Sequence, residues 1–237
     1  MYLYKLFFRI YINKINNKYH KYQIKIIDCN NTNINITNTY TIMASSITQK
    51  KQTGYLEIYV GAMYASKTSK LLELYKQYTF CNVRVTVINH AHDTRYHDTL
   101  LSSHDKVMVP CVQTDRLKEI WLNPDSEQYT DIHNSEVILI NEAQFFDDLY
   151  ECVTDMLREK KKVYIAGLDG DFERKKFGQM LELIPMCDKV TKLTALCSLC
   201  RDGTPGIFSL RLTQEKQQTL IGSDNYIPVC RYCYESR

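Results

Sequence analysis

Residues 55–68 read YLEIYVGAMYASKT. The first six residues, apolar or aromatic except for Glu57, are typical of a buried strand. The strand runs directly into the loop GAMYASKT (61–68), and a helix is predicted from Ser69 to about Tyr78. Its apolar residues recur at helical spacing, at Leu71, Leu72, Leu74, Tyr75 and Tyr78. A strand, a loop and a helix in this order predict the first unit of an α/β protein.

The loop between this strand and this helix is close to a phosphate-binding pattern. The pattern is G-x-x-x-x-G-K-[ST], and the loop is Gly61-Ala62-Met63-Tyr64-Ala65-Ser66-Lys67-Thr68. Backbone N–H groups and the helix N-terminus would bind phosphates, with Lys67 neutralising charge and the Thr68 hydroxyl reaching Mg²⁺. Ser66 stands in place of the second glycine, at a strain cost of about 1–3 kcal/mol if its φ is unfavourable. The alternative is an ordinary turn with a surface lysine.

Three further apolar runs predict strands at 83–89, 136–140 and 162–168, and an amphipathic helix is predicted over 147–160. Strands that alternate with helices favour a parallel sheet covered on both faces. After about residue 192 the pattern changes to short strand-like pieces at 208–212 and 218–222. The predicted fold is therefore α/β, a parallel sheet with flanking helices and a small C-terminal segment.

The predicted strand at 136–140 ends in the polar pair Asn141-Glu142. Ligands bind at the carboxyl edge of parallel sheets, and in P-loop enzymes an Asp there holds Mg²⁺ while a neighbouring carboxylate can act as a base. Asn141 replaces that Asp and supplies no charge, so we expect weaker binding of Mg²⁺. Glu142 alone is also compatible with a helix cap or a surface residue.

Two C-x-x-C pairs lie near the C-terminus, Cys197 with Cys200 and Cys230 with Cys233, separated by 29 residues. Four thiolates at this spacing predict a closed, structural Zn²⁺ site, and the alternative is a redox pair. An odd total of nine cysteines argues against a disulfide framework and for a reducing compartment. Zinc ribbons often bind nucleic acid, but the segment 197–233 is not strongly basic, so we expect no nucleic-acid partner.

Composition separates the N-terminal residues from the rest of the 237-residue chain. Residues 1–53 contain eight Lys or Arg and one acid, a net charge of +7, whereas residues 54–237 sum to −4. We expect a disordered extension there, with an organellar transit peptide as the alternative and Met43 as a possible internal start. No stretch is long and apolar enough to span a membrane, so no membrane partner is expected.

Taken in order, seven motifs resemble those of the type II thymidine kinases, the cytosolic cellular form also found in large DNA viruses. The resemblance covers about residues 54–234. The motifs are GAMYASKT, HDTRY (92–96), SHD (103–105), INEAQFFDDL (140–149), AGLDGDFERKKFG (166–178), KLTALCSLC (192–200) and IGSDNYIPVCRYC (221–233).

The resemblance implies roles for individual residues. Glu142 matches the catalytic base. The residues that match positions binding ATP and its phosphates are Gly61, Ala62, Met63, Tyr64, Ala65, Ser66, Lys67, Thr68, Asp93, Arg95, Asn141 and Gln144. Those that match positions enclosing thymidine are Met63, Phe145, Leu168, Phe172, Ser209 and Tyr226, the last in a "lasso" loop that closes over the nucleoside. The four paired cysteines match the family's zinc ligands.

The resemblance also implies the reaction and the assembly. The substrates would be thymidine and ATP with Mg²⁺, the protein a cytoplasmic homotetramer, and its parts an extension (1–53), a kinase domain (54–192) and a zinc-binding lasso domain (193–237). Ala65, Ser66 and Asn141 depart from the family's pattern, all on the phosphate and metal side. They leave open a second hypothesis, a catalytically impaired homologue that binds nucleosides or nucleotides.

Overall fold

The computed structural model describes residues 9–16, 21–27, 33–34, 53–92, 100–102, 108–215, 217–218 and 225–236. Contacts divide the chain into two compact units, Met1–Gln52 and Thr53–Arg237. The described strands of the first unit are β1 (Arg9–Asn16), β2 (Lys21–Ile27) and β3 (Asn33–Ile34), paired antiparallel in that order. The sequence predicts a disordered extension here, whereas Ile and Tyr alternating with polar residues also favour strands.

The second unit is built on a six-stranded sheet in which all neighbours are parallel, in the order β11-β4-β10-β9-β5-β8. This confirms the predicted parallel α/β fold. The strands are β4 (Tyr55–Gly61), β5 (Val85–His90), β8 (Val112–Thr114), β9 (Val137–Asn141), β10 (Lys162–Gly167) and β11 (Lys189–Leu193).

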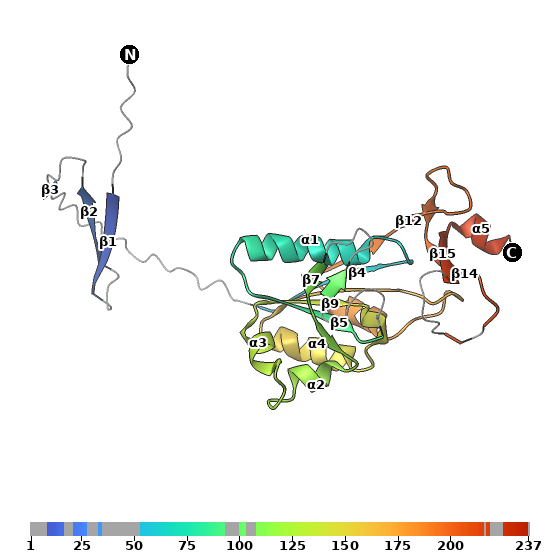
Figure 1. The fold of residues 1–237 in the computed structure, drawn as a ribbon, viewed down its shortest axis with the longest axis horizontal. Helices are drawn as coiled ribbons and strands as arrows, with labels where there is room; N and C mark the ends of the chain where they lie inside the picture. Colours follow the sequence, from blue (N-terminus) through green and yellow to red (C-terminus); the bar gives the residue numbers. More distant parts are fainter. Residues whose placement is uncertain are drawn as a thin grey trace, which may run out of the picture. The chain divides into compact units, whose positions relative to one another are not determined.

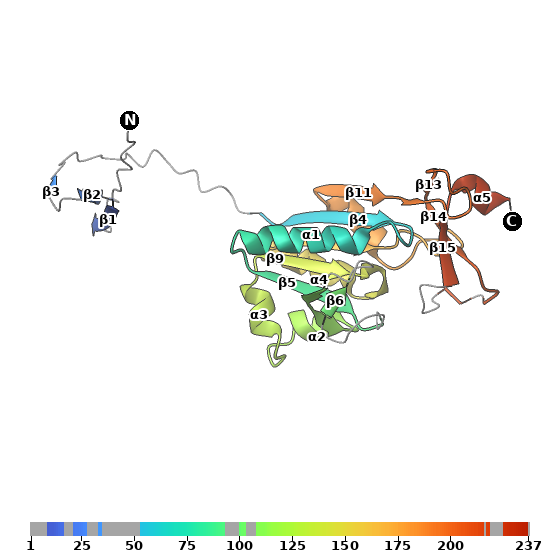
Figure 2. The same cartoon turned by 45° about the horizontal axis from the view of Figure 1, so that its top comes forward.

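Helices cover both faces of this sheet (Figure 1). Helix α1 (Lys67–Phe80) lies on one face, while α2 (Leu117–Trp121), α3 (Tyr129–Asn134) and α4 (Leu149–Arg158) lie on the other. The turned view in Figure 2 shows the same arrangement. None of the helices in the part of the chain that the structure describes is long and apolar enough to cross a membrane.

Alternation along the strands produces two hydrophobic cores. In β9, Ile138 and Ile140 belong to the core beneath α2, α3 and α4, while Val137 and Leu139 belong to the core beneath α1. The hairpin of β6 (Leu100–Ser102) and β7 (Met108–Pro110) adds to the α1 side. Burial on both faces explains why the central strands are continuous apolar runs in the sequence.

The elements predicted from these runs are present within a few residues of their expected bounds. Helix α1 begins at Lys67, two residues before the prediction, and α4 is shorter at both ends. The sequence analysis does not foresee β8, β11, α2 or α3. Edge strand β11 is mostly exposed, and three of its five residues, Lys189, Thr191 and Lys192, are polar, so it lacks the apolar run of a central strand.

Beyond β11 the chain forms two small antiparallel pairs and a final helix. The elements are β12 (Ala195–Leu196) with β13 (Pro205–Gly206), β14 (Phe208–Arg211) with β15 (Tyr226–Val229), and α5 (Arg231–Glu235). The predicted piece at 208–212 corresponds to β14, whereas 219–222 of the predicted piece at 218–222 lie outside the described residues. Two short 3₁₀ helices, η1 (Ala143–Phe145) and η2 (Met180–Met186), follow β9 and β10.

Candidate active site

The loop at residues 61–68, here called the phosphate loop, joins the carboxyl end of β4 to α1. Gly61 has φ 150°, and a Cβ there would lie 2.2 Å from the carbonyl oxygen of Leu193 at the end of β11. Glycine is therefore required where the loop passes this strand. The first turn of α1 contains no acidic residue, so its N–H groups and helix dipole favour an anion.

Ser66 has the backbone conformation that the phosphate-binding pattern normally assigns to glycine. Its φ and ψ are 58° and 26°, in the left-handed region, immediately before α1. A non-glycine residue in this region costs about 1–2 kcal/mol. The loop thus takes a conformation that suits glycine despite the serine, and the Ser66 side chain makes no capping hydrogen bond to the helix.

A chain of polar side chains links the phosphate loop to the neighbouring strand ends. Thr68 Oγ1 donates to Asn141 Oδ1 at 3.1 Å, and Asn141 Nδ2 donates to Asn89 Oδ1 at 2.8 Å. Asn141 and Asn89 are each 2% exposed, at the ends of β9 and β5. Lys67 Nζ donates to the carbonyl of Ala62 at 2.7 Å. Thr68 of the phosphate loop and Asn141 therefore meet at one edge of the sheet, and Asn89 is a neighbour that the sequence analysis missed.

Glu142 is positioned by Gln144. Glu142 has φ 50°, and its Oε2 accepts a hydrogen bond from Gln144 Nε2 at 2.7 Å. Gln144 Oε1 accepts from the backbone N–H of Leu168 at 2.9 Å, and the Gln144 side chain is buried. A Cβ at Gly178 would lie 2.1 Å from the Gln144 carbonyl oxygen. Gln144, which the resemblance assigns to ATP, thus has both ends of its amide bonded within the protein.

The residues predicted to enclose the nucleoside come from five separate segments: the phosphate loop, η1, the stretch after β10, β14 and β15. Met63 N–H donates to Ser209 Oγ at 3.0 Å, which joins the phosphate loop to β14. The guanidinium of Arg211 lies over the ring of Phe172, 3.6 Å from the ring centroid, and the same guanidinium donates to the Tyr226 hydroxyl. The Phe145 ring packs edge-on against Phe177, a residue that the sequence analysis does not assign to the site.

Two predicted site residues, Asp93 and Arg95, lie outside the described residues. The last described residues before them, at the end of β5, include His90, whose ring stacks on that of His92 at 4.8 Å. His90 Nδ1 accepts the N–H of His92 at 3.1 Å. Burial is the main cause that lowers the pKa of His90 below its usual value, and the neighbouring His92 lowers it further, so the His90 ring is neutral at pH 7.

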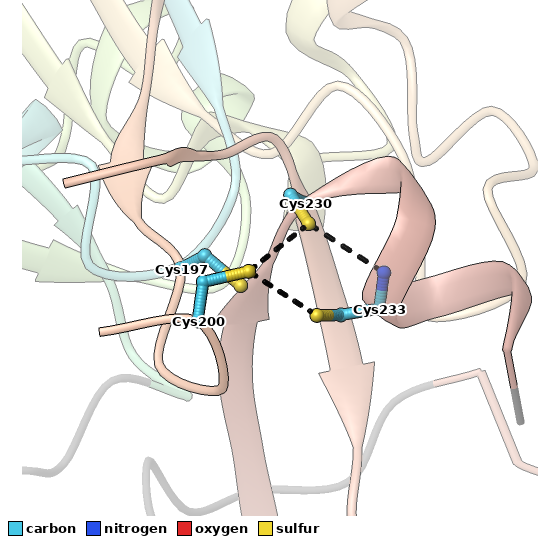
Figure 3. Close-up of side chains that lie close together, drawn as sticks. All are labelled: Cys197, Cys200, Cys230 and Cys233. Carbon is cyan, nitrogen blue, oxygen red and sulfur yellow. Dashed lines mark hydrogen bonds between the residues drawn. The ribbon is translucent and has the colours of Figure 1, made fainter. Parts of the chain in front are cut away.

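The four paired cysteines come together in the C-terminal segment (Figure 3). Their sulfurs lie within 4.8 Å of one another, with Cys200 Sγ 3.7 Å from Cys230 Sγ and 3.5 Å from Cys233 Sγ. A tetrahedral Zn²⁺ with ligands at about 2.3 Å needs sulfurs about 3.8 Å apart, so the cluster fits zinc. Burial opposes ionisation of Cys197, but surrounding backbone N–H groups outweigh it and lower the pKa of this thiol to about 6.

The architecture defines the class of the molecule: an α/β protein whose sheet presents a P-loop-type turn and an acidic strand end at one edge. A comparison with family models narrows that class. The family model described as thymidine kinase matches residues 54–234, and the chain belongs to the thymidine kinase family.

Individual relatives agree with this assignment. The chain is 41% identical over 189 residues to a thymidine kinase of Oryza sativa subsp. japonica, covering 78% of this chain and 68% of the rice protein. It is 38% identical over 184 residues to a thymidine kinase of Yaba monkey tumor virus (strain VR587), covering 77% and 96% of the two chains. It is 34% identical over 186 residues to a cytosolic thymidine kinase of Bos taurus, covering 78% and 73%.

Proposed function

We propose that this protein transfers the γ-phosphoryl group of ATP to the 5′-hydroxyl of thymidine. The observation that supports this most directly is the Thr68–Asn141 hydrogen bond, because it joins the phosphate loop to the strand end that presents Glu142. A phosphate-binding loop and a carboxylate base beside it are what phosphoryl transfer to a hydroxyl requires. Membership of the thymidine kinase family identifies the hydroxyl as that of thymidine.

In this proposal the phosphate loop binds and orients ATP. Lys67 and the N-terminal N–H groups of α1 neutralise charge on the β- and γ-phosphates. The oxygen donors of Thr68 and Asn141 suit Mg²⁺, which would offset phosphate charge when bound with ATP. Asn141 contributes no negative charge of its own, so the cation depends more on the phosphates. Asp93 and Arg95, matched by resemblance, complete the phosphate side.

Glu142 acts as the general base. As the 5′-oxygen forms its bond to the γ-phosphorus and the bond to ADP breaks, the hydroxyl proton passes to the Glu142 carboxylate. Gln144 orients this carboxylate, since its amide donates to Glu142 and accepts from the first residue after β10. The residues proposed to enclose the nucleoside are Met63, Phe145, Leu168, Phe172, Ser209 and Tyr226.

The four cysteines are proposed to hold one structural Zn²⁺ that fixes the segment bearing Ser209 and Tyr226. A homotetramer, inferred by resemblance, is part of the proposal, and light scattering of the purified protein tests it. A cytoplasmic location is also proposed, supported by the free thiols of the described cysteines.

The impaired homologue is the weaker hypothesis. Relatives from a plant, a virus and an animal are named thymidine kinase, and they support the active enzyme. In addition, Ser66 takes a glycine-like backbone conformation, and Asn141 accepts a hydrogen bond from Thr68.

A labelled-thymidine assay on the purified protein tests the proposal. We expect MgATP-dependent formation of thymidine monophosphate, and Glu142→Gln is expected to lower kcat by at least about 100-fold because the proton acceptor is lost. Glu119→Gln, at an exposed position on α2, is the matched control and should leave kcat unchanged. Wild-type protein with no more product than Glu142→Gln would sink the catalytic claim.

A further inference from the structure

Arg211 is a buried arginine at the end of β14, with 7% of its surface exposed. The sequence analysis assigns it no role. Its guanidinium lies over two aromatic rings proposed to enclose the nucleoside, with its central carbon 3.6 Å from the centroid of the Phe172 ring and 5.1 Å from that of the Tyr226 ring. A buried charge is costly unless each of its polar hydrogens has a partner, so the hydrogen bonds of Arg211 show which groups stabilise it there.

All five N–H groups of this guanidinium are used. Nη1 donates to the carbonyl oxygens of Glu215 and Gln217 at 2.8 and 2.5 Å, and Nη2 donates to that of Gln218 at 3.0 Å. Nε donates to the Tyr226 hydroxyl at 3.2 Å, and Nη2 donates to the same hydroxyl. Only the planar, five-donor fork of arginine makes this set, because lysine has three donors on one nitrogen.

The segment that carries Phe172 is also hydrogen-bonded to Gln218, one of the residues whose carbonyl accepts from Arg211. Gln218 Nε2 donates to Asp171 Oδ2 at 2.8 Å, and the Asp171 residue is itself buried. The hydroxyl of Tyr234, next to Cys233, donates to the Phe172 carbonyl at 2.6 Å. Phe172 is therefore fixed at its ring by Arg211 and at its backbone by α5.

We propose that Arg211 is a positioning residue for thymidine binding: it sets Phe172 and Tyr226 in place for the nucleoside and ties both to the backbone carbonyl groups of Glu215, Gln217 and Gln218. Arg211 touches neither phosphate nor base in this role. It acts through the two rings, so its loss changes nucleoside affinity and leaves the phosphate loop intact. This inference rests on the proposed function, because it takes Phe172 and Tyr226 as nucleoside-binding residues.

Thymidine binding by calorimetry without ATP, together with steady-state kinetics of the full chain, tests the inference. Arg211→Met keeps the apolar stem but leaves three carbonyl groups without their donor. We expect it to raise the thymidine dissociation constant about tenfold or more, with the KM for ATP within about twofold of wild type. Arg211→Lys is expected to restore only part of the affinity. Arg231→Met removes an exposed arginine whose guanidinium also lies over a ring, that of Phe208, and should bind thymidine as wild type does.

A second variant keeps the test decisive if Arg211→Met folds poorly, which zinc content and thermal unfolding report. Tyr226→Phe removes only the hydroxyl that accepts from Arg211. Alone, it should weaken thymidine binding. Added to Arg211→Lys in a double variant, it should have little further effect, because the Tyr226 hydroxyl and the Arg211 guanidinium act as one unit. Wild-type thymidine affinity in Arg211→Met or Tyr226→Phe, or an equal rise in both KM values, would overturn the inference. Wild-type protein that neither binds nor phosphorylates thymidine would overturn the proposed function as well.

Discussion

Ser66 stores backbone strain at the start of α1. Glycine at this position should raise the free energy of unfolding by about 1 kcal/mol, since the left-handed penalty is removed and no capping bond is lost. That change corresponds to a rise in Tm of roughly 2–4 °C for a domain of this size. Lys76→Gly, at an exposed position in the middle of α1, is the control with the opposite sign, because glycine destabilises a helix interior. Thermal unfolding measures both, and a lower Tm for Ser66→Gly would contradict the strain argument.

Asn141 replaces a carboxylate beside the phosphate loop. Asn141→Asp should lower the Mg²⁺ concentration that gives half-maximal activity, because a charged oxygen then faces the metal–phosphate site. Thr68 can still donate to the new carboxylate, and Asn89 can turn its amide to donate as well. Titration of activity with Mg²⁺ at fixed ATP measures the effect. An unchanged or higher requirement would show that this position does not contribute to metal binding.

Individual residues of the site differ in how far the sequence predicts them. The phosphate loop, Glu142 and the cysteine pairs are contiguous or closely spaced motifs, so their chemistry is visible in the sequence alone. Asn89 and Arg211 are isolated polar residues. The hydrogen-bond partner of Asn89 lies 52 positions away, and those of Arg211 lie 4 to 15 positions away, so their roles depend on strand register and loop path. Nothing in the residues next to them indicates these bonds.

At the scale of elements, the cysteine cluster is expected to support the proposed nucleoside side of the site. Cys230→Ser should lose the zinc and raise the KM for thymidine more than the KM for ATP, because α5 then no longer holds Tyr234 against Phe172. Cys81→Ser, at an exposed cysteine that follows α1, is the control and should change neither value. Metal analysis beside the kinetics checks this, and a zinc-free variant with wild-type KM for thymidine would separate the metal from the site.

Elements are predictable from sequence where burial is complete. The central strands β4, β9 and β10 are buried on both faces, so their apolar runs are unambiguous. β8 and β11 lie at the two edges of the sheet and combine polar with apolar residues. The helices α2 and α3 have five and six residues, too few to establish a helical period.

At the scale of the whole molecule, the basic charge and the proposed activity belong to different units. Residues 1–52 hold the net charge of +7, and the unit from Thr53 onward sums to −4. A chain lacking residues 1–52 should keep kcat and both KM values within about twofold, since a separate compact unit contains every proposed site residue. It should also cease to bind a cation exchanger at pH 7, because its net charge changes sign. A tenfold loss of activity would show that the first unit takes part in catalysis.

The close approach of Gly61 to the Leu193 carbonyl limits which substitutions this enzyme can tolerate. It is a contact between two backbones, so no side chain can adjust it. Leu193 is the last residue of β11 and leads within a few residues to Ala195 in β12, so the contact fixes where the C-terminal segment begins relative to the phosphate loop. Any side chain at position 61 is therefore expected to displace β11 or the phosphate loop, so this position tolerates only glycine.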